Sequence, residues 1–154
     1  MQLFLLRHSI AEATVTTDFE RRLTPKGIAK ASRLAKHLDT LNVAPSVILH
    51  SPLVRSQQTA QIIAKGASLP LIELPEVIDA GDSLLAVIAA GGWKAPMVIG
   101  HNPGISVLAS RLAGTEGPLG FRTCSFAAFE LDAMPPKSSR LVHWITTPPA
   151  CDHP

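Results

Sequence analysis

Short apolar runs alternate with stretches of helical periodicity along most of the chain. The runs are rich in Leu, Ile and Val, as is typical of strands buried in a parallel sheet. We predict such strands at residues 3–6, 46–50, 71–74 and 97–99. Two later runs, 121–131 and 140–145, also have strand character and are joined across Pro135-Pro136.

Capping signals frame the helices that we expect between these strands. Thr24-Pro25 and Ser51-Pro52 each place a hydroxyl side chain before a proline, a pairing that favours a helix start. We therefore interpret Ser51 as a helix cap rather than a nucleophile, since its neighbours lack the glycines of a nucleophile elbow. Helices are predicted over residues 25–41, 51–65, 82–92 and 105–112.

This order of elements predicts an α/β fold. We expect a three-layer sandwich with a mostly parallel central sheet and helices on both faces. Because no helix is expected between the last two strands, one of them should be antiparallel at an edge of the sheet. The 154 residues suffice for one domain, which we place at 1–146, followed by a C-terminal tail at 147–154.

Composition and charge exclude several classes of protein. Hydrophobic residues make up 46% of the chain and charged residues 17%, which argues against disorder. The net charge is only +2, and the Lys and Arg residues are scattered, so we expect no nucleic-acid partner. Cys124 and Cys151 form neither a disulfide framework nor a zinc motif. Nothing resembles a leader or a membrane span, so we expect a cytoplasmic protein without membrane contact.

Three of the predicted strands run directly into charged or imidazole side chains. The first is followed by Arg7 and His8, and the fourth by Gly100 and His101. The second precedes a helix whose first turn carries Arg55. Because the carboxyl ends of parallel strands meet at one edge of the sheet, we expect these residues to share a crevice there.

The side chains brought to this crevice suit phosphoryl transfer. The forked donors of Arg7 and Arg55 match the oxygens of a phosphate group. Helix N-termini near Ser51 and Asn102 add oriented amides, so we include Asn102 among the substrate-binding residues. One imidazole can attack phosphorus, and a second can donate to the phosphoryl oxygens. The acidic cluster that Mg²⁺ requires is missing, and we expect no metal or other cofactor.

The same residues form three ordered motifs that resemble those of the histidine phosphatase superfamily, also called phosphoglycerate mutase-like. They are Arg7-His8 after the first strand, Ser51-Pro52-Leu53-x-Arg55-x-x-Gln58-Thr59, and Gly100-His101-Asn102-Pro103. The short length and two further stretches resemble the bacterial phosphohistidine phosphatases of the SixA type. These stretches are Arg21-x-Leu23-Thr24-x-x-Gly27 and Pro75-Glu76.

The resemblance implies a role for each matching residue. His8 would be the nucleophile that carries a covalent phosphoryl group. Arg7 and Arg55 would bind that group, and His101 would be the second histidine of the pocket. The resemblance also implies the α/β sandwich fold of the superfamily and no metal cofactor.

Two positions leave alternatives open. Arg21 is expected to add an anion contact from the loop before the first helix, although Arg22 beside it could take the same role. Ser9 stands where the family usually has glycine. Its side chain either narrows the approach to the phosphate or donates its hydroxyl to it, so we include Ser9 among the substrate-binding residues.

Acidic residues are scarce near the motifs. Mutase-type members place a Glu after the second motif, where this chain has Gln57, Gln58 and Gln61. Asp79 and Glu76 are the remaining candidates for a general acid. An alkoxide leaving group needs such an acid, whereas the imidazole of a phosphohistidine leaves more easily. The scarcity of acidic residues favours a substrate in which a P–N bond is cleaved.

We therefore expect a phosphatase that acts on phosphohistidine in a signalling or phosphorelay protein. A small-molecule phosphomonoesterase of the same fold is the first alternative, and relative rates on P–N and P–O substrates would separate the two. A non-catalytic phosphate-binding regulatory module is the second, and it predicts phosphate binding without turnover.

Overall fold

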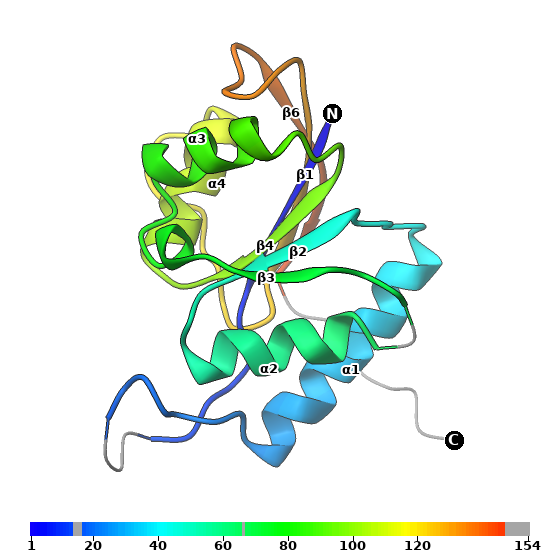
Figure 1. The fold of residues 1–154 in the computed structure, drawn as a ribbon, viewed down its shortest axis with the longest axis vertical. Coiled ribbons are helices and arrows are strands. Elements are labelled where there is room, and N and C mark those ends of the chain that lie inside the picture. Colours follow the sequence, from blue (N-terminus) through cyan, green and yellow to red (C-terminus); the bar gives the residue numbers. More distant parts are fainter. Residues whose placement is uncertain (14–16, 66, 147–154) are drawn as a thin grey trace.

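A six-stranded sheet lies between two layers of helices (Figure 1). The computed structural model describes residues 1–13, 17–65 and 67–146, so the predicted tail at 147–154, including Cys151, lies outside the described residues. The strands are β1 (Gln2–Arg7), β2 (Val47–His50), β3 (Leu71–Glu73), β4 (Pro96–Gly100), β5 (Phe126–Leu131) and β6 (Ser139–Ile145). The helices are α1 (Pro25–Thr40), α2 (Val54–Ile63), α3 (Asp82–Gly91) and α4 (Gly104–Ala113), with a 3₁₀ turn, η1, at Pro75–Val77.

The sheet has the order β3-β2-β4-β1-β5-β6. The first four strands in this order pair in parallel, as predicted for a mostly parallel sheet. The antiparallel edge is also confirmed, and it is built from two strands. β5 runs opposite to β1 and lies one position inside the edge, while β6 reverses again and forms the edge itself.

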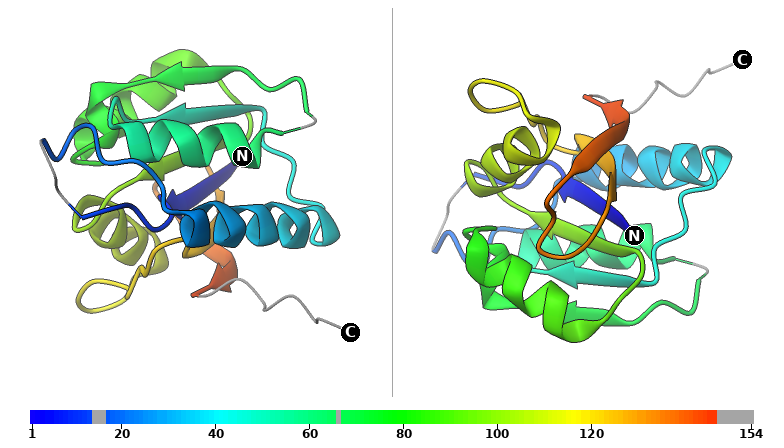
Figure 2. Two further views of the ribbon diagram at one scale, coloured as in Figure 1. Left: turned by 90° about the horizontal axis from the view of Figure 1, so that it is seen from below. Right: turned by 90° about the horizontal axis from the view of Figure 1, so that it is seen from above.

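Alternation of side chains along the strands builds two separate cores. In β1, Leu3 and Leu5 pack on one face against α3 and α4, whereas Phe4 and Leu6 pack on the other against α1 and α2. Successive side chains of a strand point to opposite faces, so an all-apolar strand serves both layers. This arrangement confirms the three-layer sandwich, and Figure 2 shows the helices on both sides of the sheet.

The start of α1 follows its capping signal. Thr24 is the N-cap, and its hydroxyl accepts a hydrogen bond from the Gly27 N–H at 2.9 Å. The buried stripe of the helix begins at Gly27. The backbone of Ile10 lies so close to Gly27 that a Cβ there would overlap the Ile10 carbonyl. Ile28, the next residue, lies outside this stripe and is 46% exposed.

Other element boundaries differ from the prediction. α2 begins at Val54 rather than Ser51 and has no side-chain cap, so Ser51 is not the cap that its sequence suggested. The run predicted at residues 121–131 forms a strand only from Phe126, because the backbone turns at the buried residue Cys124, which has a φ of 61°. Within the described part of the chain, no helix has the length and apolar character needed to cross a membrane.

Candidate active site

The carboxyl ends of β1, β2 and β4 lie side by side, as the sequence predicted. Arg7 pairs with Gly100, and His50 pairs with Ile99, so the three strands end at the same level of the sheet. The next residue along each chain therefore arrives at one place. This register brings together His8 and His101, whose ring centroids are 5.0 Å apart.

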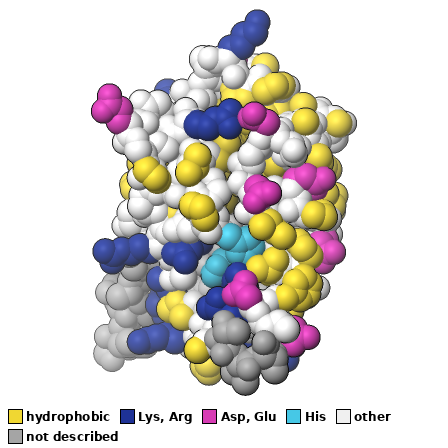
Figure 3. Space-filling view, turned by 90° about the vertical axis from the view of Figure 1, so that its left-hand side faces the viewer, with side chains coloured by type: hydrophobic (Ala, Val, Ile, Leu, Met, Phe, Trp, Pro, Cys, Tyr) yellow, Lys and Arg dark blue, Asp and Glu magenta, His cyan; other side chains and the backbone are white. Residues whose placement is uncertain are grey.

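A pocket of about 320 Å³ opens at this edge of the sheet. Figure 3 shows this side of the molecule, with histidine side chains at its centre and Lys and Arg side chains near them. The pocket is lined by Arg7, His8, Ile10, Ala11, Arg21, Arg55, His101, Asn102 and Thr123. All four residues predicted to be catalytic are therefore in the wall, together with two of the predicted binding residues.

The imidazole of His8 is held in one tautomer. Its Nδ1 lies 2.7 Å from the carbonyl oxygen of Ser9, which can only accept, so Nδ1 carries the hydrogen. The lone pair is therefore on Nε2, which accepts a hydrogen bond from Nε of Arg55 at 3.3 Å. Burial lowers the pKa of His8 from 6.5 to about 3, so the ring is neutral at pH 7. A neutral imidazole whose Nε2 lone pair is unprotonated is a competent nucleophile once the hydrogen bond from Arg55 is released.

Arg55 is almost fully buried in the first turn of α2, and its contacts reveal a residue that the sequence did not single out. Its terminal nitrogens donate to the backbone carbonyl of Asp18 at 2.8 Å and to Oδ2 of Asp18 at 3.1 Å. The carboxylate compensates a guanidinium placed at the positive end of the helix dipole. No spacing along the chain could have indicated this contact, because Asp18 and Arg55 are 37 residues apart.

Arg21 and Asn102 line the pocket and also bind neighbouring loop residues. Arg21 donates to the carbonyl of Glu12 at 2.6 Å and pairs with Oδ1 of Asp18 at 2.9 Å. Asn102 donates to the carbonyl of Phe121 at 2.7 Å. Arg22, the alternative to Arg21, is exposed and outside the pocket wall.

Arg7 and His101 complete the positive and imidazole groups of the wall. Arg7 donates to the carbonyl of Phe121 at 3.0 Å, and its buried Nε has no partner among the described residues. Nε2 of His101 lies 2.5 Å from the buried hydroxyl of Ser51. Burial lowers the pKa of His101 from 6.5 to about 4, with the charge of Arg55 as the second cause. His101 is therefore also neutral at pH 7.

The side chain of Ser9 does not face the pocket, so the structure gives no support to the predicted substrate contact of its hydroxyl. The side chain is fully buried and donates to the carbonyl of Gly27 at 2.6 Å. Its backbone N–H donates to the hydroxyl of Thr59 at 3.0 Å. The hydroxyl points toward α1 because that buried carbonyl needs a donor, so Ser9 ties the end of β1 to the helix layer.

The two predicted general acids also lie outside the pocket wall. Asp79 is exposed, and its backbone carbonyl packs against Gly104 at the start of α4. Glu76 is half-buried in η1, and its Oε2 has no hydrogen-bond partner among the described residues. The carboxylate that contacts the pocket's guanidinium groups is that of Asp18 instead.

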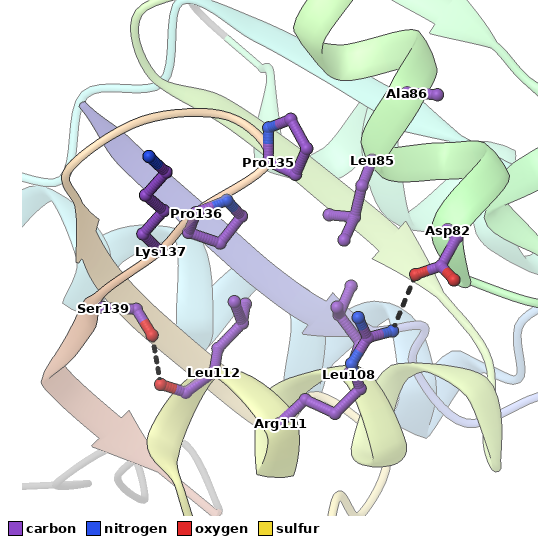
Figure 4. A pocket seen from close by; sticks show the side chains of 10 residues that line it. All are labelled: Asp82, Leu85, Ala86, Leu108, Arg111, Leu112, Pro135, Pro136, Lys137 and Ser139. Atoms are coloured by element: carbon purple, nitrogen blue, oxygen red, sulfur yellow. Dashed lines mark hydrogen bonds and ion pairs between the residues drawn. The ribbon is translucent and has the colours of Figure 1, made fainter.

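A second cavity, of about 290 Å³, lies between α3, α4 and the segment that joins β5 to β6 (Figure 4). Leu85, Leu108 and Leu112 make it largely apolar, and an Arg111–Asp82 ion pair spans one side. It shares no lining residue with the histidine pocket. In the described part of the chain, no three His, Cys, Asp or Glu side chains are grouped to hold a metal ion.

Comparison with known proteins identifies the family of this chain. Residues 3–82 match the model of the histidine phosphatase superfamily, branch 1. The chain is 30% identical to the phosphohistidine phosphatase SixA of Escherichia coli over 139 residues, which cover 86% of each protein. It is 30% identical to the SixA homolog of Haemophilus influenzae, across 93% of this chain and 94% of that protein.

A solved structure shows the same architecture. The protein histidine phosphatase SixA complexed with tungstate superimposes with a TM-score of 0.83 at 27% identity, covering 96% of this chain and 97% of that one. The matching segment of the family model contains Arg7, His8 and Arg55, three residues of the pocket wall. The chain thus belongs to the histidine phosphatase superfamily, branch 1.

Proposed function

We propose that this protein is a phosphatase that hydrolyses phosphohistidine on a signalling or phosphorelay protein in the cytoplasm, through a covalent intermediate on His8. The main support for this proposal is the orientation of the His8 ring, whose Nδ1 contacts the Ser9 carbonyl and whose Nε2 accepts from Nε of Arg55. We infer the substrate class from the SixA relatives, because the E. coli protein is named phosphohistidine phosphatase. Tungstate, held by the related structure, is a tetrahedral oxyanion like phosphate.

The first step transfers the phosphoryl group to this protein. Nε2 of His8 attacks phosphorus, and the P–N bond of the substrate breaks. The bonding electron pair stays on the substrate's ring, which leaves as neutral imidazole when its other nitrogen is protonated. In this proposal Arg7 and Arg55 hold the phosphoryl oxygens, and His101 donates to them as charge develops.

The second step releases inorganic phosphate. Water attacks the phosphorus, the P–Nε2 bond breaks, and its electron pair returns to His8. Both protons of the water remain on the product, H₂PO₄⁻, so no proton has to be added to the leaving imidazole of His8. Nδ1 of His8 keeps its hydrogen throughout, because the Ser9 carbonyl still accepts it.

The composition of the pocket wall supports a P–N bond over a P–O bond. The wall contains arginine, histidine and asparagine side chains, whereas neither Asp79 nor Glu76 contributes to it. A phosphomonoester needs a proton for its alkoxide, and a positioned acid normally supplies it. Phosphohistidine does not make that demand on the enzyme.

The test compares the two kinds of bond on the purified protein. A phosphocarrier protein phosphorylated on histidine and para-nitrophenyl phosphate are each incubated with the wild type, with His8→Ala and with a His37→Ala control. His37 lies on α1, outside the pocket. We expect rapid loss of phosphohistidine, slow ester cleavage, and loss of both only in His8→Ala.

A trapping experiment identifies the intermediate. Rapid quenching with a radiolabelled substrate should leave an acid-labile, alkali-stable phosphate on the peptide that contains His8. Faster cleavage of the ester than of phosphohistidine would instead indicate a phosphomonoesterase. Phosphate binding without turnover would indicate the regulatory module, and either result overturns the proposal.

A further inference from the structure

The carboxylate of Asp18 bridges two guanidinium groups of the pocket wall while remaining open to solvent. Oδ1 pairs with Arg21 and Oδ2 pairs with Arg55, yet the side chain is 61% exposed. A carboxylate can accept about four hydrogen bonds, and these two contacts leave accepting positions free. Asp18 is not itself in the pocket wall, but its exposed carboxylate is an anion beside two guanidinium groups of that wall.

The backbone holds this residue in place independently of its charge. The carbonyl oxygen of Asp18 accepts from Arg55 at 2.8 Å, and the carbonyl of the next residue, Phe19, accepts from the Val54 N–H at 3.2 Å. Both contacts fasten the loop to the start of α2. The carboxylate can thus face an incoming substrate without losing its position over Arg55.

A phosphohistidine substrate brings a particular need to this place. Its phosphoryl group enters the pocket, and its imidazole ring extends outward toward the mouth. The ring leaves readily only as neutral imidazole, which requires a proton on its other nitrogen before the P–N bond breaks. The pKa of an ordinary imidazole is about 6.5, so near neutral pH much of the substrate lacks this proton.

We propose that Asp18 is a specificity-determining residue that binds the protonated outer nitrogen of the substrate's imidazole ring and thereby favours phosphohistidine over phosphomonoesters. This inference rests on the proposed function. The anion keeps on the substrate the proton that the leaving group needs, so the enzyme requires no general acid of its own. A phosphomonoester has no such proton, and for it the carboxylate only repels the phosphate dianion.

The charge of Asp18 matches this role. Hydrogen bonds from Arg21 and then Arg55 hold the pKa of its carboxyl below the ordinary 3.8, so it is an anion at neutral pH. Arg21 and Arg55 face the Asp18 carboxylate directly. His101 is near enough that the Asp18 charge offsets part of the lowering of the His101 pKa. His101, with a pKa of about 4, is already neutral at pH 7.

The experiment compares Asp18→Asn with Asp39→Asn, an exposed acid near the end of α1. Single-turnover transfer to His8 is measured with histidine-phosphorylated phosphocarrier protein, and kcat/KM is measured with para-nitrophenyl phosphate. In Asp18→Asn we expect transfer from phosphohistidine to fall about fivefold, the scale of one exposed ion pair, and ester cleavage to stay level or rise. Asp39→Asn should change neither.

A pH profile supplies a second readout. With saturating wild-type enzyme, transfer should decline at high pH as the bound substrate ring loses its proton. An anion beside a cationic acid raises its pKa, so Asp18→Asn should move this decline to lower pH. A parallel fall on both substrates with an unshifted profile would mean that Asp18 merely positions Arg55, and would overturn the inference. Failure of the wild type to cleave phosphohistidine would instead overturn the proposed function.

Discussion

Nε of Arg55 donates a hydrogen bond to Nε2 of His8 across 3.3 Å, so the guanidinium lies directly beside the nitrogen proposed to attack phosphorus. Arg55 comes from the first turn of α2, and His8 follows β1, yet both are almost fully buried. The contact orients the lone pair before the reaction. It also leaves the guanidinium next to any phosphoryl group that becomes attached to Nε2.

Arg55→Lys should separate charge from geometry at this contact. Lysine keeps the positive charge but lacks the planar fork that reaches His8 and the phosphoryl oxygens together. We expect kcat/KM for phosphohistidine to fall by about 10²–10³, the scale of losing one preorganised donor. Steady-state kinetics check this, with Arg22→Lys as the control because Arg22 is exposed and outside the pocket wall. Wild-type rates in Arg55→Lys would contradict the role of the fork.

Ser9→Ala should lower stability more than activity. The hydroxyl of Ser9 donates to the buried carbonyl of Gly27, and its loss leaves that acceptor unsatisfied. We expect the free energy of unfolding to fall by about 1–3 kcal/mol, as measured by urea denaturation. The kcat/KM of the folded variant should stay within about twofold, because the substitution keeps the backbone carbonyl that accepts the Nδ1 hydrogen of His8. Ser32→Ala, on the outer face of α1, is the matched control, and a selective loss of activity in Ser9→Ala would place the hydroxyl in the phosphate site.

The free energy of unfolding should fall as the pH drops below about 6.5. Burial lowers the pKa of His8 to about 3 and that of His101 to about 4, whereas both rings have a pKa of 6.5 when unfolded. Between these values the unfolded chain binds more protons than the folded one, so acid favours unfolding. Each histidine contributes at most about 1.4 kcal/mol per pH unit in this window.

Urea denaturation at pH 7, 6, 5 and 4.5 measures this dependence, with His8→Gln as the comparison. The variant lacks one of the two neutral rings, so its stability should vary less steeply with pH than that of the wild type. The absolute stability of the variant does not matter, because the slopes are compared. Equal slopes in the two proteins would show that His8 titrates normally in the folded state.

Much of the fold could be predicted because its causes are local. An apolar run such as that of β1 is buried on both faces, which requires helices on both sides of a sheet. The signal at Thr24 worked for the same reason, since a cap and the amide it accepts from are three residues apart. Ser51 carries the same signal but is drawn into a long-range contact with His101, and α2 begins later.

The meeting of Arg7, His8, Arg55 and His101 was predictable from the order of strands and helices, because the carboxyl ends of parallel strands reach one edge of the sheet. The contacts that surround these four residues were not predictable in this way. The hydroxyl of Ser9 turns toward α1, and Asp79 and Glu76 stay outside the pocket. Asp18 lies against an arginine 37 residues away. Such contacts depend on how loops pack against distant elements, and spacing along the chain carries no record of them.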